Sequence, residues 1–200
     1  MSEANMSEAN MSESIEQYRE RVLSAYQAVD LAPVQQFIDL LKKARSEGNT
    51  VFTAGNGGSA ATASHFATDL SKGASYQKPT RFRVVALTDS ISTISAYAND
   101  VSFDVVFAEQ LTNLAQPGDI LVTISGSGNS PNILAAQNRA KELNVTSVAM
   151  TGFAGGKSGD LADVHINTPS DHMGRIEDLH MSLCHMIAFH FMDNEQHHIS

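Results

Sequence analysis

Short apolar runs alternate with longer segments of helical periodicity through most of this chain. The runs are mainly apolar and bounded by polar residues, which is typical of buried strands; they cover residues 51–54, 83–87, 120–124, 146–150 and 164–166. The other segments repeat apolar residues every three to four positions, which predicts helices; they cover residues 60–70, 91–98, 105–114, 133–143 and 174–191. Repeated strand–helix units with apolar strands predict an α/β fold whose parallel sheet carries helices on both faces.

Two further helices are predicted before the first strand. Apolar residues recur at helical spacing over residues 15–29, where they are Ile15, Tyr18, Val22, Tyr26 and Val29. Pro33 opens the second helix, because proline is well tolerated in a first helical turn, and this helix ends near Gly48. A single sheet does not need these helices as well as the long one at 174–191, so we expect them to pack between subunits.

The first 14 residues repeat Met-Ser-Glu-Ala-Asn twice and then begin it again. Polar, low-complexity sequence of this kind is predicted to be disordered, so residues 1–14 are left out of the predicted fold. The predicted organisation is one domain over residues 15–194 and a tail at 195–200 that contains His197 and His198.

Composition excludes several classes of function. The chain has 200 residues, enough for one domain with a full core. Its formal net charge of −9 gives no sign of the positive charge that a nucleic-acid partner requires. No apolar stretch is long enough to cross a bilayer and no secretory signal is apparent, so we expect no membrane partner. The single cysteine, Cys184, fits a reducing compartment, and the cytoplasm is the expected location.

The segment 125–130, Ser-Gly-Ser-Gly-Asn-Ser, joins a predicted buried strand to a predicted helix. Glycines let the backbone approach an anion, the N–H groups of a helix N-terminus point at it, and serine hydroxyls add donors. The loop has no lysine and does not match the nucleotide-binding pattern that ends in Gly-Lys-Ser/Thr, so it suits a single phosphate monoester better than a nucleotide. The alternative is an ordinary polar connection with a helix cap.

A second loop of this kind, Gly-Asn-Gly-Gly-Ser at 55–59, follows the first predicted strand. Three glycines in four positions indicate positive φ angles or a close ligand, although a tight turn would account for one of them. Ligands of parallel sheets bind at the carboxyl ends of the strands, and both loops lie at such ends. The sequence therefore predicts a binding site between them.

Candidate metal ligands and proton-transfer groups lie on two predicted helices. His65 and Asp69 are four residues apart and share a helix face, which suits two metal ligands, an acid with its orienting partner, or a simple exposed pair. The last helix carries Glu177, His180, Cys184, His185 and His190, which are candidate ligands or else core and interface residues. Glu177 and His185 are separated by about 12 Å of helix rise, so they meet at one ion only by leaning together or by coming from different subunits.

Taken together, these residues resemble the SIS (sugar isomerase) family of phosphosugar-binding domains, and most of all its phosphoheptose isomerase branch. The resemblance runs from about residue 15 to 192 and is carried by the segments 54–61, 65–67, 98–100, 117–119, 125–131, 151–152, 155–157 and 175–180, and by His185.

The resemblance implies a three-layer flavodoxin-like core, a homotetramer with active sites at subunit interfaces, and one zinc ion per subunit near the sugar. It implies interconversion of sedoheptulose 7-phosphate and D-glycero-D-manno-heptose 7-phosphate, a phosphorylated seven-carbon sugar that feeds bacterial heptose synthesis for lipopolysaccharide. The implied zinc ligands are His65, Asp69, Glu177 and His185. The implied substrate contacts are Asn56, Gly57, Gly58, Ser59, Asp69, Asn99, Asp100, Ser125, Gly126, Ser127, Ser130 and Glu177.

Aldose–ketose isomerisation moves a proton between C1 and C2 through an enediol, which needs a base near carbon and an acid near oxygen. By the same resemblance, Asp69 is the catalytic base and His185 the catalytic acid. The chain departs from the family at three of these positions: Asp69 stands where Glu is usual, Glu177 where Gln is usual, and Gly126 where Thr is common.

Two other functions remain open on these residues. One is that of a non-catalytic SIS protein of the type that binds a replication initiator, although such relatives lack the position of His185, which this chain keeps. The other is isomerisation of a different phosphosugar, because Asp69 and Gly126 alter the pocket.

Overall fold

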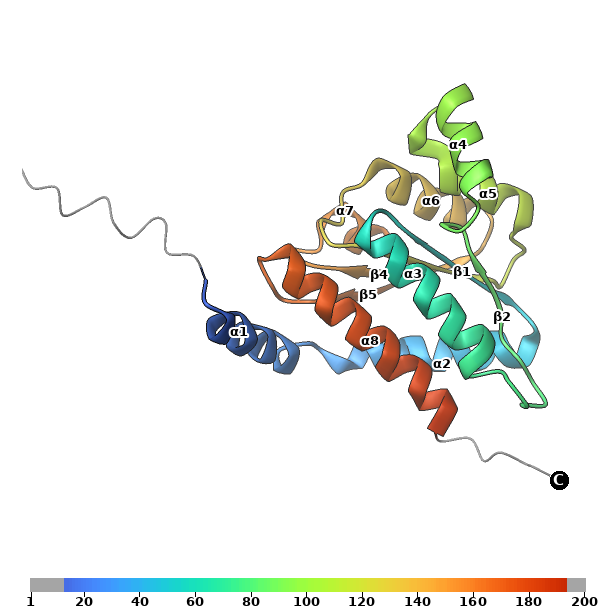
Figure 1. The fold of residues 1–200 in the computed structure, drawn as a ribbon. Helices are drawn as coiled ribbons and strands as arrows, with labels where there is room; N and C mark the ends of the chain where they lie inside the picture. The colour runs from blue at the N-terminus through green and yellow to red at the C-terminus, as the bar shows by residue number, and fades with distance from the viewer. Residues whose placement is uncertain (1–12, 194–200) are drawn as a thin grey trace, which may run out of the picture.

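The computed structural model describes residues 13–193, which form a parallel five-stranded sheet between layers of helices (Figure 1). The strands lie in the order β2-β1-β3-β4-β5. Their bounds are β1 Thr50–Gly55, β2 Arg83–Ala86, β3 Ile120–Ser125, β4 Thr146–Thr151 and β5 Val164–Asn167. All neighbouring strands pair in parallel, so the predicted α/β class and its parallel sheet are confirmed, and the strand order is that of flavodoxin-like folds.

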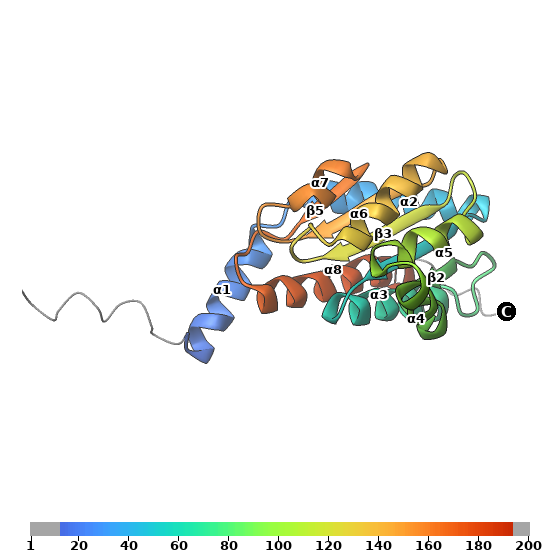
Figure 2. The same cartoon turned by 90° about the horizontal axis from the view of Figure 1, so that it is seen from above.

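Alternate residues of each strand face two separate cores. Val51, Val122 and Ile124 pack with apolar residues of one helix layer, whereas Phe52 and Leu121 pack with the other. The first layer contains α2 Leu31–Glu47, α3 Gly58–Thr68 and α8 Met173–Asp193. The second contains α5 Val106–Leu114 and α6 Pro131–Glu142. Figure 2 shows α3 and α8 on one side of the sheet and α6 on the other.

The first helix, α1, spans Ile15–Gln27, so its predicted start at residue 15 is confirmed, and it ends two residues before the predicted end at residue 29. Ser14 accepts a hydrogen bond from the backbone N–H of Gln17, whose side chain accepts one from the N–H of Ser14. This reciprocal capping box, together with the contacts of Glu13, makes residues 13 and 14 part of the described fold. The predicted disorder of the remaining repeat, and the tail at 195–200, lie outside the described residues.

Helix α2 starts at Leu31 and not at Pro33. The carboxylate of Asp30 accepts a hydrogen bond from the backbone N–H of Ala32 and so caps the helix two residues upstream of the predicted start. Pro33 still lies in the first turn, where its missing N–H removes no helical hydrogen bond. The predicted end near Gly48 is confirmed, because Gly48 ends the helix in the left-handed conformation.

Other boundaries differ where the sequence gives little local signal. Helix α4, Ile91–Asp100, includes Asn99 and Asp100, which were expected to follow it. The short helix α7, Gly156–Leu161, was not predicted, because two glycines and no apolar repeat mark it. A turn of π-helix, η2 Asp69–Gly73, continues α3, and a 3₁₀ turn, η3 Phe103–Val105, precedes α5.

The chain changes direction between β1 and β3, and this determines where a ligand can enter. Helix α3 follows β1 on one face of the sheet, and α6 follows β3 on the opposite face. The two connections therefore separate at the carboxyl edge, which leaves the crevice in which flavodoxin-like folds bind ligands. Among the described residues, no helix has the length and apolar character that a membrane crossing requires.

Candidate active site

The carboxyl edge of the sheet holds a cleft of about 290 Å³, which we call the loop cleft. It is formed by the loop after β1, the loop after β3 and the first turns of α8. Its lining residues are Asn56, Gly57, Gly58, Ser59, Ile124, Ser125, Gly126, Ser127, Ser130, Met173 and Glu177. The structure thus brings together both predicted loops and Glu177 from the far end of the chain, and it adds Met173.

The loop after β1 turns into α3 through a backbone that needs glycine. Gly57 has φ +54° and ψ −123°, a conformation that residues with a side chain rarely adopt, and it precedes the first helical residue. Gly58 has another reason, because a Cβ atom there would lie 2.7 Å from Oε1 of Glu177. The carboxylate of Glu177 therefore packs directly against the N-terminus of α3.

The loop after β3 presents hydroxyls and backbone donors. The N–H of Gly128 donates to the carbonyl of Ser125, and the hydroxyls of Ser125 and Ser130 lie 3.5 Å apart across the loop. Helix α6 starts directly after Ser130 with Pro131 in its first turn. Glu177 is the only charged residue that lines the loop cleft in the described chain, so an anion there would be held by N–H groups, hydroxyls and two helix N-termini.

A pair of asparagines connects the two loops. The side-chain amides of Asn56 and Asn132 exchange two hydrogen bonds of 2.9 Å, and Asn132, in the first turn of α6, is buried. The pair fixes the loop after β1 against the helix that follows β3. The sequence interpretation missed Asn132, whose only local signal is its position directly after Ser130-Pro131.

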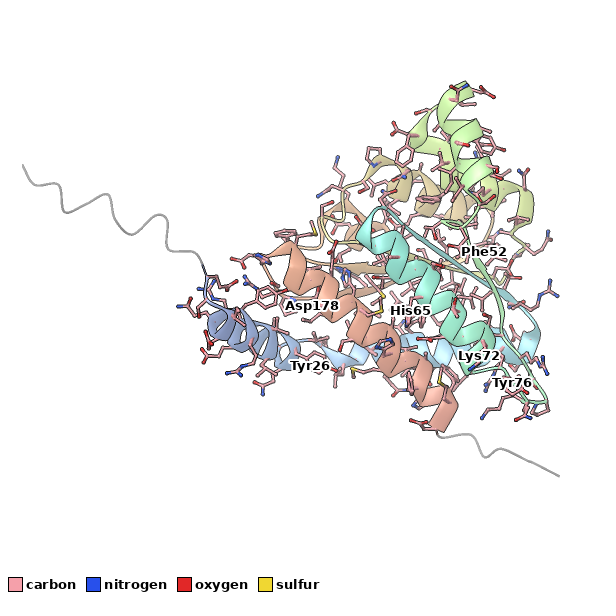
Figure 3. The ribbon with its side chains drawn as sticks, in the orientation of Figure 1. Tyr26, Phe52, His65, Lys72, Tyr76 and Asp178 are labelled. Atoms are coloured by element: carbon pink, nitrogen blue, oxygen red, sulfur yellow. The ribbon has the colours of Figure 1, made fainter. Side chains whose placement is uncertain are left out.

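Two histidines and an aspartate meet between α3 and α8, and we call them the triad. Nε2 of His65 lies 3.3 Å from Oδ2 of Asp69 and 2.9 Å from Nε2 of His185, which is 3.9 Å from the same carboxylate oxygen. Figure 3 shows His65 on α3, where that helix runs beside α8. The side chains of both histidines are 44% exposed and that of Asp69 is 18% exposed, so the triad opens to solvent on one side.

The donor atoms of the triad fit a divalent metal ion. All three lie within 4.8 Å of one another, and Oδ2 of Asp69 is buried without a hydrogen-bond partner. A tetrahedral zinc ion with bonds of about 2.0–2.1 Å separates its ligand atoms by about 3.4 Å, close to the spacing seen here. Three protein ligands and one open position are typical of catalytic zinc sites.

Besides the residues of the two loops, Glu177, Asn99 and Asp100 also lie away from the triad. Glu177 lines the loop cleft and is not part of the metal-capable group found among the described residues. Asn99 and Asp100 are exposed at the end of α4, where the side chain of Asn99 donates to the carboxylate of Asp100. Within one subunit these two residues are outside the loop cleft, and their role as substrate contacts stays a prediction.

Two other candidates on α8 belong to the core. The ring of His180 is 1% exposed and lies 3.0 Å, at Nε2, from the backbone carbonyl of Thr151. Burial lowers the pKa of His180 to about 4, so the ring is neutral at pH 7. Cys184 is fully buried, and burial raises the pKa of its thiol, which makes it unreactive.

Comparison with known proteins points to one family. Residues 6–152 match the model of the SIS domain. The chain is 39% identical over 160 residues to a phosphoheptose isomerase of an Azoarcus species, a match covering 78% of this chain and 81% of that protein. It is 46% identical over 143 residues to a phosphoheptose isomerase of Mycobacterium tuberculosis, covering 72% of each chain.

Solved structures agree with these sequence matches. A phosphoheptose isomerase from Francisella tularensis superimposes with a TM-score of 0.84 at 29% identity, covering 90% of this chain and 97% of the other. One from Neisseria gonorrhoeae gives a TM-score of 0.81 at 32% identity, with coverage of 88% and 95%. The likeness therefore extends over nearly the whole described chain.

Proposed function

The chain belongs to the SIS domain family, in its phosphoheptose isomerase branch, and from this we propose that it interconverts sedoheptulose 7-phosphate and D-glycero-D-manno-heptose 7-phosphate. The observation that carries the proposal is the presence, beside α8, of both a cleft whose loops offer backbone N–H groups and hydroxyls to an anion and a His–Asp–His triad. The cleft suits the phosphate of the sugar, and the triad supplies the acid, the base and the ligands that isomerisation needs.

In this proposal the loop cleft holds the phosphate end of the sugar. Backbone N–H groups at the starts of α3 and α6 and the hydroxyls of Ser59, Ser125, Ser127 and Ser130 donate to the phosphate oxygens. Anchoring one end of an open-chain sugar restricts where C1 and C2 can lie, which contributes to the rate through positioning. Glu177 faces the sugar hydroxyls from the same cleft.

Asp69 and His185 carry out the proton transfers. Asp69 takes the proton from C1 of the ketose to give the 1,2-enediol, and the proton returns at C2 to give the aldose. His185 passes a proton between the oxygens on C1 and C2, so no net charge is left on the sugar. A carboxylate has two oxygens and an imidazole two nitrogens, so each group can hold an ion with one atom and act on the substrate with the other.

We propose zinc as the metal, held by His65, Asp69 and His185. When bound, zinc polarises the substrate carbonyl and so favours loss of the neighbouring proton. The family pattern implies that Glu177 is a further ligand. In a single subunit its carboxylate packs against Gly58, so it would have to leave that position to join the other three.

The proposed assembly is a homotetramer with active sites at subunit interfaces. About 12 Å of helix rise separates Glu177 from His185. One active site is therefore completed more easily by the loop cleft of one subunit and the triad of another than by the loop cleft and the triad of the same subunit. Large apolar side chains exposed on α1, α4 and α8 support such packing; they include Ile15, Leu23, Ile91, Met186 and Phe189. The lone Cys184 suits a reducing compartment, and we propose the cytoplasm.

The test is turnover of sedoheptulose 7-phosphate by the purified protein, with and without added zinc, beside His185→Ala. His190→Ala is the matched control, because His190 lies on the same helix but packs against Phe191, outside the triad. We expect zinc-dependent turnover that His185→Ala lowers by about 10³-fold and the control leaves within twofold. Phosphosugar binding without turnover at any zinc concentration would instead identify a binding protein or an isomerase of another phosphosugar.

A further inference from the structure

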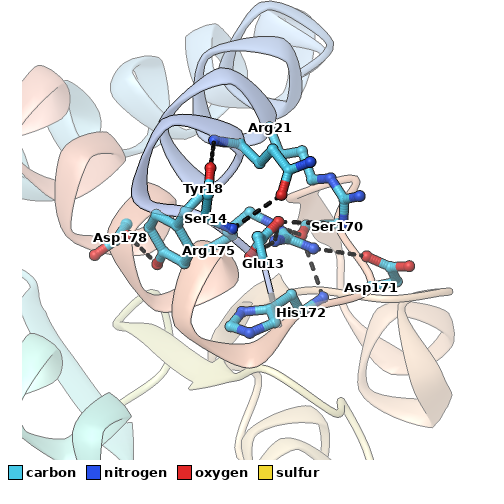
Figure 4. Close-up of polar contacts among 10 residues, drawn as sticks. Glu13, Ser14, Tyr18, Arg21, Ser170, Asp171, His172, Arg175 and Asp178 are labelled. Atoms are coloured by element: carbon cyan, nitrogen blue, oxygen red, sulfur yellow. Dashed lines mark hydrogen bonds and ion pairs between the residues drawn. The ribbon is translucent and has the colours of Figure 1, made fainter. Parts of the chain in front are cut away.

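None of the residues of helix α1 is buried, so the polar contacts that join this part of the chain to α8 have few buried apolar contacts beside them. Just before it, the carboxylate of Glu13 accepts two hydrogen bonds from one guanidinium nitrogen of Arg175, at 2.8 and 2.9 Å (Figure 4). Arg175 lies in the first turn of α8 with its side chain 5% exposed, and 162 residues separate it from Glu13. This contact joins the start of the chain to the helix that enters the loop cleft.

A second contact joins α1 itself to α8. The hydroxyl of Tyr18 donates a hydrogen bond of 2.6 Å to Asp178, and its ring packs edge-on against that of His172. The hydrogen bond to Asp178 is the main reason that the pKa of Tyr18 is raised to about 12. We call Glu13, Tyr18, Arg175 and Asp178 the clamp.

The charge of Arg175 explains why the clamp needs Glu13. A cation in the first turn of a helix is opposed by the helix dipole, and a buried cation requires a charged partner. Its other carboxylate partner, Asp171, has a side chain that is 93% exposed, which leaves Glu13 as the better-shielded counter-charge. Loss of Glu13 would therefore leave the first turn of α8 poorly neutralised.

The clamp lies beside residues that line the loop cleft. Arg175 precedes Glu177 by two positions and Asp178 follows it by one, and Met173 opens the same turn. The carboxylate of Glu177 packs against Gly58 at the start of α3, so its place in the cleft depends on the position of this turn.

We propose that Glu13 and Tyr18 are positioning residues for the candidate active site: by holding Arg175 and Asp178 on either side of Glu177, they fix the first turn of α8 over the loop cleft. The inference rests on the proposed function for its kinetic consequence alone. His185, the member of the triad on α8, lies two turns beyond Asp178, and the clamp contacts no residue of the triad, so the clamp acts on substrate binding and not on proton transfer.

The experiment compares Glu13→Gln with Glu20→Gln, a change at an exposed position of α1, the helix that follows Glu13. Amide hydrogen exchange of residues 176–183 is measured first, and KM and kcat for sedoheptulose 7-phosphate second. We expect Glu13→Gln to speed exchange in this segment about tenfold and raise KM about tenfold, with kcat within threefold of the starting protein. Glu13→Asp keeps the charge and should recover most of the exchange protection; Tyr18→Phe removes only the hydroxyl and should give a smaller effect in the same direction.

Exchange in Glu13→Gln and Tyr18→Phe that matches Glu20→Gln would overturn the clamp, as would faster exchange with unchanged KM. A fall in kcat without a change in KM would also overturn it, because the clamp does not reach the triad. If the starting protein does not isomerise the sugar, the proposed function fails, and the KM comparison is replaced by the calorimetric affinity for sedoheptulose 7-phosphate. Because α1 buries none of its residues, the core is expected to fold in each variant, which circular dichroism checks.

Discussion

The loop cleft and the triad are held in place by different means. Most of the loop cleft consists of backbone and short side chains at the ends of β1 and β3, and every residue of β3 is buried; α8 adds Met173 and Glu177. The triad consists of longer side chains on two helices, and its histidines are almost half exposed. One half of the candidate site is therefore fixed mainly by sheet topology, and the other by the packing of α3 against α8.

This difference predicts that changes in the two halves affect different kinetic parameters. A site made from backbone donors is preformed and tolerates the loss of one hydroxyl, because several donors share the anion. A site made from three side-chain atoms loses its chemistry when one atom is changed. We expect changes in the triad to affect kcat and changes in the loop cleft to affect KM, and the following experiments test that separation.

The largest expected effect is that of Asp69→Asn. The substitution keeps the shape of the side chain but removes the proposed base and the negative charge of the triad, so kcat should fall about 10³-fold. Zinc content should fall with it, whereas KM should stay within threefold, because the loop cleft is unchanged. Steady-state kinetics and metal analysis check this against Asp39→Asn, a surface aspartate of α2 that pairs with Lys42. A raised KM with normal kcat would contradict the division between the two halves.

The loop cleft was easier to predict from sequence than the triad. Its residues are contiguous in two loops, each directly after an apolar strand, and parallel strands bring their carboxyl ends to one edge. The spacing of His65 and Asp69 was compatible with a shared ligand but also with a simple surface pair. Only the packing of α3 on α8 adds His185 to them, and no local pattern encodes that contact.

The remaining features depend on contacts between distant parts of the chain. Asn132 pairs with Asn56 across 76 positions, and Glu13 reaches Arg175 across 162. Glu13 also lies in a repeat whose composition predicts disorder, so the composition gave no indication that this residue contacts Arg175 in the clamp. Such pairs become visible only when the fold is known, because each residue alone is an ordinary polar side chain.

His180 lies on α8 between Glu177 of the loop cleft and His185 of the triad. Its expected effect is smaller and concerns the stability of the folded protein, on which both halves depend. Its pKa is lowered from 6.5 to about 4 by burial, so the folded protein binds this proton less readily than the unfolded chain. The contribution to stability is complete above pH 6.5 and is lost as pH falls through about 4. Between pH 7 and pH 5 it should lower the free energy of unfolding by about 2 kcal/mol.

Chemical denaturation at the two pH values measures this effect. His180→Gln cannot gain the proton and should reduce the pH dependence by that amount, whereas the control His190→Gln should retain it. An unchanged pH dependence in His180→Gln would show that the buried ring is not the group responsible.

The smallest expected effect concerns Gly126 and tests whether the loop cleft can be altered without touching the triad. A Cβ atom on Gly126 would lie 2.5 Å from Sδ of Met173, so Gly126→Ala must displace that side chain, which is the flexible and partly exposed end of the contact. The cost should be about 1 kcal/mol, seen as a roughly fivefold rise in KM with kcat unchanged. Met173→Ala removes the obstructing sulfur, so the double variant should return to within twofold of the KM of Met173→Ala alone. Additive effects on KM would mean that Gly126 is needed for another reason, such as direct backbone contact with the phosphate, and a change in kcat would mean that the two halves of the site are coupled through α8.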